Sequence, residues 1–254
     1  LRIVFIGGGT TGVELAAEVH EFLKEVQKEY SRIAFDAVEF YLIEAGDKLL
    51  PVFHPKFSEK ALKILNKKGF KVIFKDPAAE VDSNGVICAS LRTIKSRTVI
   101  WTSGVLPSQI AITPEPERQK GRIVVDPSLN MKNFPEVFVL GDQAAVADKN
   151  FGILPTSAQV AAEEGWFIGK NIAKFISKKP LNNFHYWHKG DLVSMGKRKA
   201  FAQIGRSFIR FGGPIAWFIW RFNYLTKMPG FAKKVRLFFD WILYFVSRRD
   251  TSEI

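Results

Sequence analysis

The sequence predicts an α/β fold that begins with a parallel β-sheet, and two observations support this prediction. Short apolar runs at residues 1–6, 37–43 and 70–74 alternate with helical patterns at residues 13–29 and 57–68. Such alternation is typical of parallel strands joined by crossover helices. A glycine-rich turn also connects the first run to the first helical pattern. Together these features predict a Rossmann-like unit of the β-α-β-α-β type.

The glycine-rich turn fits the pattern G-x-G-x-x-G between a strand and a helix, which favours dinucleotide binding over a glycine turn without a ligand. Gly7 permits the tight turn, Gly9 lets backbone N–H groups approach a pyrophosphate, and Gly12 lets the helix pack closely on the strand. The helix N-terminus supplies partial positive charge. The turn has the sequence Gly7-Gly8-Gly9-Thr10-Thr11-Gly12, and we expect all of these residues except Gly8 to contact the cofactor.

Glu44 stands at the C-terminal end of the second apolar run. A carboxylate at this place accepts hydrogen bonds from both ribose hydroxyls of an adenosine and repels a 2′-phosphate, so NADH is favoured over NADPH. The gap from Gly12 to Glu44 exceeds the usual spacing of about 20 residues. A long first helix and a loop around residues 30–36 account for the difference. A solvated carboxylate at a strand end is the alternative interpretation.

The middle of the chain contains further strand and helix signals. Residues 81–90 predict a hairpin, which continues into a strand at residues 97–102, and we expect this meander to cover one edge of the parallel sheet. Residues 137–140 predict a second buried strand, directly followed by Gly141 and Asp142. An aspartate in this position can bind a ribityl or pyrophosphate group, although Gly-Asp also forms ordinary turns. Later predictions are a helix at residues 157–177, a linker at 180–183 and an antiparallel pair of strands at 191–195 and 199–204.

Composition excludes several classes of function. Cys88 is the only cysteine, which excludes an internal disulfide, a dithiol redox centre and a cysteine zinc site. His185 and His188 form an H-x-x-H pair without nearby carboxylate or cysteine ligands, so we favour a structural role and predict no metal site. The chain begins at Leu1 with neither methionine nor a signal peptide, which suggests that upstream sequence is missing.

The formal charge of +12 is concentrated near the C-terminus, because residues 181–254 carry 13 basic and 4 acidic side chains, a net +9. Residues 214–225 and 235–246 are nearly all apolar and rich in Trp and Phe, but each run is shorter than the roughly 20 residues of a spanning helix. We therefore expect residues 214–249 to bind an anionic membrane surface as amphipathic helices. A buried helical hairpin, a homodimer interface and a membrane-spanning hairpin are the alternatives. Nucleic acid is disfavoured because no binding module is recognised.

Several stretches, taken in order, resemble type II NADH dehydrogenase, the non-pumping NADH:quinone oxidoreductase within the FAD-dependent pyridine nucleotide-disulfide oxidoreductase superfamily. The resemblance covers the whole chain and corresponds to the C-terminal two-thirds of that family. The matching stretches are residues 7–15 (GGGTTGVEL), 42–45 (LIEA), 101–105 (WTSGV), 139–142 (VLGD), 158–161 (AQVA) and the tryptophan-rich tail.

The resemblance implies a division into an NADH-binding domain (residues 1–105), the returning part of a split FAD-binding domain (106–180) and a C-terminal membrane-anchoring region (181–254). The family's FAD fingerprint would precede Leu1. Glu14 matches the acid near the nicotinamide, and Gly104, Asp142 and the helix that carries Gln159 match flavin contacts. Ser103, Gly141 and Ala158 are further cofactor-binding candidates. Ala158, Gln159 and Glu163 match the quinone-site helix, where Glu163 replaces the family's glutamine and leaves Gln159 as the better candidate for a quinone contact.

The expected function is transfer of hydride from NADH to FAD, followed by reduction of a membrane quinone by a peripheral enzyme on the cytoplasmic or matrix-equivalent face. By the resemblance, Glu14, Gln159 and Glu163 are the catalytic candidates. Two alternatives are kept: a catalytically silent, NADH-binding module at the membrane, and another FAD and NAD(P)H reductase such as a ferredoxin reductase-like enzyme. A lone cysteine argues against the disulfide reductases and the sulfide:quinone enzymes.

Overall fold

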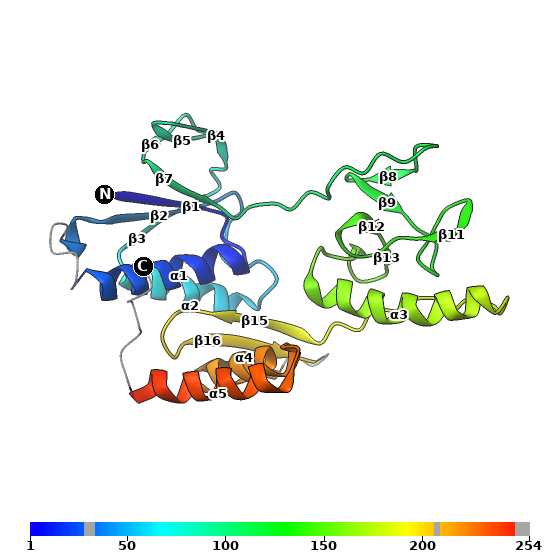
Figure 1. Cartoon of the computed structure of the whole chain (residues 1–254). Helices are drawn as coiled ribbons and strands as arrows, with labels where there is room; N and C mark the ends of the chain where they lie inside the picture. The colour runs from blue at the N-terminus through cyan, green and yellow to red at the C-terminus, as the bar shows by residue number, and fades with distance from the viewer. Residues whose placement is uncertain (28–33, 206–208, 247–254) are drawn as a thin grey trace. The chain divides into compact units, whose positions relative to one another are not determined.

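The computed structural model describes residues 1–27, 34–205 and 209–246, with side chains up to Trp241 (Figure 1). The chain forms two compact units. Unit 1 consists of Leu1–Ser103 and Lys189–Ile254, and unit 2 consists of Gly104–His188. Most of the loop expected at residues 30–36 lies outside the described residues.

A four-stranded parallel sheet with the order β3-β2-β1-β7 forms the centre of unit 1. Its elements alternate as the sequence predicts, because one crossover helix follows β1 and another follows β2. The elements are β1 (Arg2–Ile6), α1 (Thr10–Val26), β2 (Glu39–Glu44), α2 (Pro55–Lys67), β3 (Phe70–Phe74) and β7 (Thr98–Trp101). The predicted β-α-β-α-β unit is therefore confirmed.

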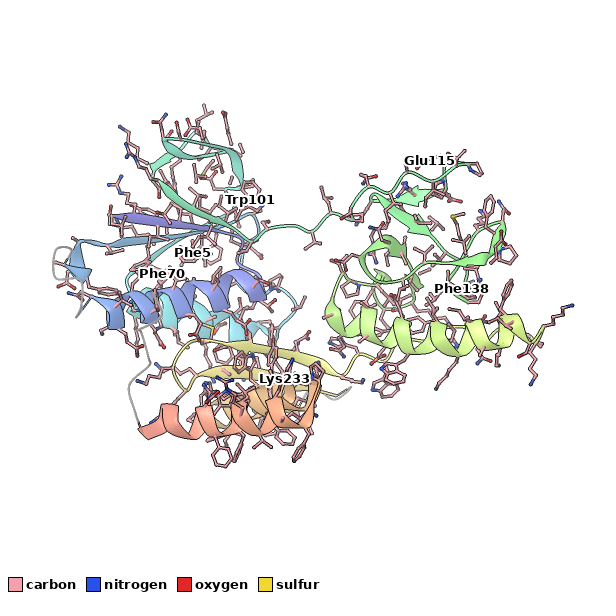
Figure 2. All side chains as sticks on the ribbon, viewed as in Figure 1. Phe5, Phe70, Trp101, Glu115, Phe138 and Lys233 are labelled. Atoms are coloured by element: carbon pink, nitrogen blue, oxygen red, sulfur yellow. The ribbon has the colours of Figure 1, made fainter. Side chains whose placement is uncertain are left out.

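Different elements pack on the two faces of this sheet. Successive side chains of a strand point to opposite faces, so Phe5 packs against α1 and α2, and Val4 packs on the other side. Phe5 lies on the face of the sheet that α1 and α2 cover (Figure 2). The centroid of its ring is 5.9 Å from the centroid of the Phe70 ring.

An antiparallel meander covers the second face of the parallel sheet. It comprises β4 (Ala78–Asp82), β5 (Gly85–Cys88) and β6 (Thr93–Lys95). Its buried residues Val86, Cys88 and Ile94 share one core cluster with Val4 and Ile6 of β1. The expected meander is therefore divided in the structure: β7 forms an edge strand of the parallel sheet, whereas β4 to β6 cover a face of the sheet and not its edge. The residues of β1 are apolar on both faces, and a sheet of this kind needs a layer on each of them.

A three-stranded antiparallel sheet, ordered β15-β16-β17, packs on the outer side of α1 and α2 (Figure 1). The rings of Phe57 from α2 and Phe201 from β16 stack at 4.7 Å, and Val193 and Met195 join the same core. The elements are β15 (Gly190–Ser194), β16 (Ala200–Ile204) and β17 (Ile209–Gly213). The predicted pair of strands is confirmed. The third strand was not predicted, because Arg210 and two glycines obscure its apolar pattern.

Two helices complete unit 1, α4 (Pro214–Lys227) and α5 (Phe231–Val246). Ala216 and Trp217 of α4 are buried against Ala200 and Ala202 on the outer face of β16. The guanidinium of Arg221 lies over the rings of Trp217 and Trp241, at 4.1 and 4.8 Å from their centroids, and so connects α4 with α5.

Unit 2 is a small core of short strands covered by one long helix, α3 (Ala158–Ile176). The strands are β8 (Arg118–Gln119), β9 (Arg122–Val124), β10 (Asn130–Met131), β11 (Phe134–Phe138), β12 (Ala144–Ala145), β13 (Ala147–Asp148) and β14 (Gly152–Ile153), with a 3-10 turn η2 (Gly141–Gln143) before β12. The prediction of a buried strand at residues 137–140 is wrong. β11 ends at Phe138 and, among the described strands, pairs with β10 alone, so its residues keep some exposure to solvent.

Candidate functional site

The glycine turn after β1 is closed on one side and open on the other. A Cβ added at Gly12 would lie 1.9 Å from the carbonyl oxygen of Gly7, so α1 rests directly on the backbone that leaves β1. Gly7 itself adopts φ +109°, which is accessible to glycine and strained for other residues. By contrast, a Cβ at Gly9 would meet nothing within 4 Å, and Gly9 is partly exposed. The open side leaves room for a ligand group against the backbone.

The N-terminus of α1 has the properties of an anion site. Gly9 is its N-cap and supplies no side-chain hydrogen bond, and the first turn carries no acidic residue. Among the residues that the structure describes, no side chain therefore caps the first N–H groups of α1. These groups and the helix dipole favour an anion such as a phosphate.

Glu44 fastens the glycine turn to the end of β2. One of its carboxylate oxygens accepts a hydrogen bond from the backbone N–H of Gly8 at 2.6 Å, and the other accepts one from Gly46 at 2.7 Å. A carboxylate has about four acceptor positions, so two remain for ribose hydroxyls. The predicted site residue thus has a second role in shaping the turn. In the sequence, only Gly46, two residues after Glu44, hints at this structural role.

Thr102 and Ser103 line the turn from the end of β7. The hydroxyl of Thr102 donates to the carbonyl of Ile6 at 2.8 Å, and the Ser103 backbone lies beside Gly7. Sequence reasoning selected Ser103 but missed Thr102, whose signal is a hydroxyl residue directly after an apolar strand. Gly104 begins unit 2 and is exposed.

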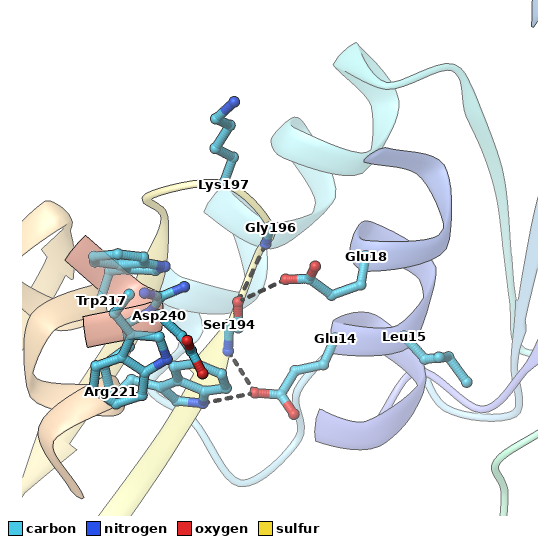
Figure 3. Close-up of a pocket in the computed structure, with 11 residues that line it drawn as sticks. Glu14, Leu15, Glu18, Ser194, Gly196, Lys197, Trp217, Arg221 and Asp240 are labelled. Carbon is cyan, nitrogen blue, oxygen red and sulfur yellow. Dashed lines mark hydrogen bonds between the residues drawn. The ribbon is translucent and has the colours of Figure 1, made fainter. Parts of the chain in front are cut away.

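Glu14 faces the C-terminal part of unit 1. Its Oε1 accepts hydrogen bonds from the backbone N–H of Ser194 on β15 at 2.6 Å and from Nε1 of Trp220 on α4 at 3.2 Å (Figure 3). Burial raises the pKa of this carboxyl above its ordinary value, and the two hydrogen bonds oppose that shift. Glu14 therefore connects the helix that follows the glycine turn to the sheet and helices at the C-terminal end.

A cavity of about 580 Å³ lies beside Glu14, between α1, β15, α4 and α5 (Figure 3). Acidic, basic and aromatic side chains line it. Its lining residues are Glu14, Leu15, Glu18, Ser194, Gly196, Lys197, Trp217, Trp220, Arg221, Asp240 and Trp241. The lining combines α1 with segments that lie about 180 to 230 residues later in the sequence, and the cavity was not predicted.

The candidate residues of unit 2 gather at η2 and at the beginning of α3. Asp142 is exposed within η2, and Gly141 adopts φ +63° one residue before it. The backbone N–H of Gly141 donates to Oε2 of Glu164 on α3 at 2.5 Å. A Cβ at Gly141 would lie 3.5 Å from the Cβ of Ala161, also on α3. η2 and the first half of α3 therefore form one local structure.

The N-terminus of α3 presents the other predicted residues of this unit. Ser157 caps the helix by accepting a hydrogen bond from the N–H of Val160 at 3.3 Å, and Ala158 is exposed. The amide nitrogen of Gln159 is buried and has no hydrogen-bond partner among the described residues. Glu163 follows one helical turn later and is partly buried. The orphaned nitrogen of Gln159 lacks an acceptor that a bound ligand could provide.

Comparison with family models places most of this chain in one group. Residues 1–165 match the model described as pyridine nucleotide-disulphide oxidoreductase. The chain belongs to the pyridine nucleotide-disulphide oxidoreductase family. Residues 188–250 of this family member match a second model, the NDH2 C-terminal domain, which begins at the end of unit 2 and covers β15 to α5.

Curated relatives of this oxidoreductase family member extend the comparison. A probable NADH dehydrogenase of Dictyostelium discoideum is 30% identical over 256 residues, which are 99% of this chain and 56% of that protein. The type II NADH:quinone oxidoreductase Ndh of Mycobacterium tuberculosis is 29% identical over 98% of this chain and 55% of its own length. The chain spans about half the length of the curated relatives it matches. The resemblance to type II NADH dehydrogenases is confirmed.

Solved structures of the same fold include NDH2 from Plasmodium falciparum in complex with NADH. It superimposes with a TM-score of 0.85 at 19% identity and covers 96% of this chain and 65% of its own. A ferredoxin reductase from Rhodopseudomonas palustris reaches a TM-score of 0.54 at 18% identity over 84% of this chain. At these identities the likeness establishes the α/β fold of this family member.

Proposed function

We propose that the protein passes hydride from NADH to FAD and then reduces a membrane quinone. The observation that carries this proposal is the open glycine turn, in which Gly9 and the uncapped start of α1 lie next to a strand-end carboxylate. The pyrophosphate of NADH would lie on Gly9 and the first N–H groups of α1, and Glu44 would accept its adenosine ribose hydroxyls. The relatives named NADH dehydrogenase support the choice of NADH.

The residues of unit 2 fit a flavin. Asp142 offers an exposed carboxylate to a ribityl hydroxyl, Gly104 and Gly141 leave the backbone accessible, and Gln159 has a buried amide nitrogen without an acceptor. Bound FAD would supply the two-electron chemistry, which no side chain of the protein can perform. In this proposal Gln159 and Glu163, one helical turn apart on α3, contact the quinone, and the exposed Ala158 at the start of the helix contacts the flavin.

The regions of the chain then have separate tasks. We assign NADH binding to residues 1–105, the returning part of an FAD-binding domain to residues 106–180, and membrane anchoring to residues 181–254. Glu14 is assigned to the nicotinamide end through the family resemblance, and the hydrogen bonds from Ser194 and Trp220 hold it in place.

Helices α4 and α5 support a membrane-binding role for the C-terminal region. Both expose large apolar side chains, and Phe218, Phe222, Phe231 and Phe239 are each more than half exposed. Lys227, Lys233 and Arg236 are exposed on the same two helices. In the part of the chain that the structure describes, no helix is long and apolar enough to cross a membrane. Exposed Phe among cations fits binding in the plane of an anionic interface.

One experiment tests both halves of the proposed function. Under anaerobic conditions, NADH should bleach the flavin absorbance of the purified protein, and anionic vesicles that carry ubiquinone should restore it. The protein should sediment with these vesicles, and 1 M salt should release it only in part, because salt screens charges but leaves apolar burial intact.

Each alternative gives a distinct result in the same experiment. NADH binding without flavin absorbance indicates the silent module. Reoxidation by ferredoxin but not by quinone indicates a ferredoxin reductase. A soluble dimer with no affinity for vesicles shows that α4 and α5 form a contact between copies of the chain, which contradicts the membrane assignment.

A further inference from the structure

Glu164 is a fully buried acid in the first half of α3, and the proposed function gives it no role. Its side chain has no exposed surface, and its Oε2 accepts the hydrogen bond from the backbone N–H of Gly141 at 2.5 Å. The charged groups that face it are Arg122 from β9 and Asp142 from η2. Burial raises the pKa of this carboxyl to about 7, against the effects of the Gly141 hydrogen bond and of Arg122.

Arg122 is a basic group whose charge acts on this acid, and it is itself buried. One of its terminal nitrogens donates to the carbonyl of Leu154 at 2.8 Å. Its Nε and Nη2, and Oε1 of Glu164, have no hydrogen-bond partner among the described residues. Burying two ionisable groups with incomplete hydrogen bonding costs free energy, and such groups therefore need an explanation. Glu164 accepts a hydrogen bond from the backbone N–H of Gly141, and we therefore look for its role at this turn.

We propose that Glu164 is a positioning residue, which holds the Gly141–Asp142 turn so that Asp142 can bind FAD. This inference rests on the proposed function. Gly141 adopts φ +63° and is fixed from α3 by the Glu164 hydrogen bond and by the nearby Cβ of Ala161. Asp142 is exposed and makes its contact with ligand only if the turn before it is held. Because Gln159 also belongs to α3, this helix sets both the Asp142 turn and the proposed quinone contact.

Three variants test the proposal with FAD as the probe, at pH 6. Below the pKa of about 7 the Glu164 carboxyl is mostly protonated, and glutamine is its closest neutral mimic. Glu164→Gln keeps an oxygen that can accept from Gly141, so we expect its dissociation constant for FAD to stay within about threefold of the wild type. Glu164→Ala leaves the Gly141 N–H without an acceptor, and we expect FAD affinity to fall about tenfold.

Asn171→Ala is the matched control. Asn171 is also a fully buried polar residue of α3, and its amide nitrogen donates to the carbonyls of Asn182 at 3.0 Å and Ser128 at 3.3 Å. Its loss should lower the melting temperature about as much as Glu164→Ala does, while FAD affinity stays unchanged. Amide exchange at Gly141 should accelerate in Glu164→Ala alone, and this readout does not depend on FAD.

The possible outcomes separate this inference from the proposed function. If wild-type protein binds FAD and Glu164→Ala binds it equally well, the positioning role is wrong and the proposed function stands. Loss of FAD from Asn171→Ala to the same extent also overturns the inference, because the effect is then one of stability. If the wild type binds no FAD while Gly141 exchange still depends on Glu164, the flavin half of the proposed function fails together with the inference.

Discussion

Replacing Gly12 with alanine is expected to lower the melting temperature of unit 1 by roughly 10 °C. The added Cβ would lie 1.9 Å from the carbonyl oxygen of Gly7 and 2.7 Å from Oγ1 of Thr102. Relief requires α1 to move away from β1, which breaks the packing of Val13 and Ala16 in the main core. Overpacking costs about 1–3 kcal/mol, and the upper end applies to a clash with backbone. Each kcal/mol shifts the melting temperature by roughly 2–4 °C for a domain of this size. Thermal melting followed by circular dichroism checks the result.

Gly169→Ala is the control for this effect. Gly169 lies inside α3, and a Cβ there would meet nothing within 4 Å. Alanine in a helix interior is favoured over glycine by about 1 kcal/mol, so this variant should melt at the same temperature or slightly higher. A Gly12→Ala protein that melts like the wild type would show that α1 does not rest on the glycine turn as described.

Gly9→Ala is expected to reduce NADH affinity about tenfold to a hundredfold while the fold remains intact. The backbone at Gly9 is extended, at φ −70° and ψ −174°, and alanine adopts this conformation without strain. Its Cβ would meet nothing within 4 Å in the protein, but it would fill the space against which the pyrophosphate is proposed to lie. The loss of glycine at the N-cap costs about 1 kcal/mol at most.

Titration of NADH into the Gly9→Ala and wild-type proteins, with their melting curves, checks this expectation. Gly12→Ala should lower the melting temperature, whereas Gly9→Ala should weaken NADH binding and leave the melting temperature nearly unchanged. Unchanged NADH affinity in a folded Gly9→Ala protein would place the phosphates elsewhere.

Much of the fold could be predicted because its determinants are local. The apolar runs and helical patterns of residues 1–74 predict β1 to β3 with α1 and α2, and Ser157 marks the start of α3 as its N-cap. Errors arise where local pattern and tertiary role diverge. Val137 and Phe138 look like a buried strand, yet they belong to a two-stranded ribbon with one partner. The meander also resembles an edge element, and only the buried contacts of Val86 and Ile94 show that it covers a face.

In the candidate site, too, the residues set by local sequence could be predicted and those set by tertiary packing could not. Gly9, Gly12 and Glu44 could be found because their function depends on a short motif and a strand end. The partners of Glu14 and Glu164 could not, because Ser194 lies 180 residues from Glu14 and the hydrogen bond to Gly141 depends on the packing of α3. The cavity beside Glu14 likewise depends on tertiary packing of α1 with α4 and α5 (Figure 3).

The most direct test of the proposed dinucleotide site is a comparison of NADH and NADPH binding by isothermal titration. NADH should bind with one molecule per chain, and NADPH should bind at least tenfold more weakly, because the Glu44 carboxylate at the end of β2 repels a 2′-phosphate. A tenfold difference corresponds to about 1.4 kcal/mol. Absence of NADH binding, or equal binding of the two nucleotides, would contradict the assignment of the glycine turn and Glu44 to NADH.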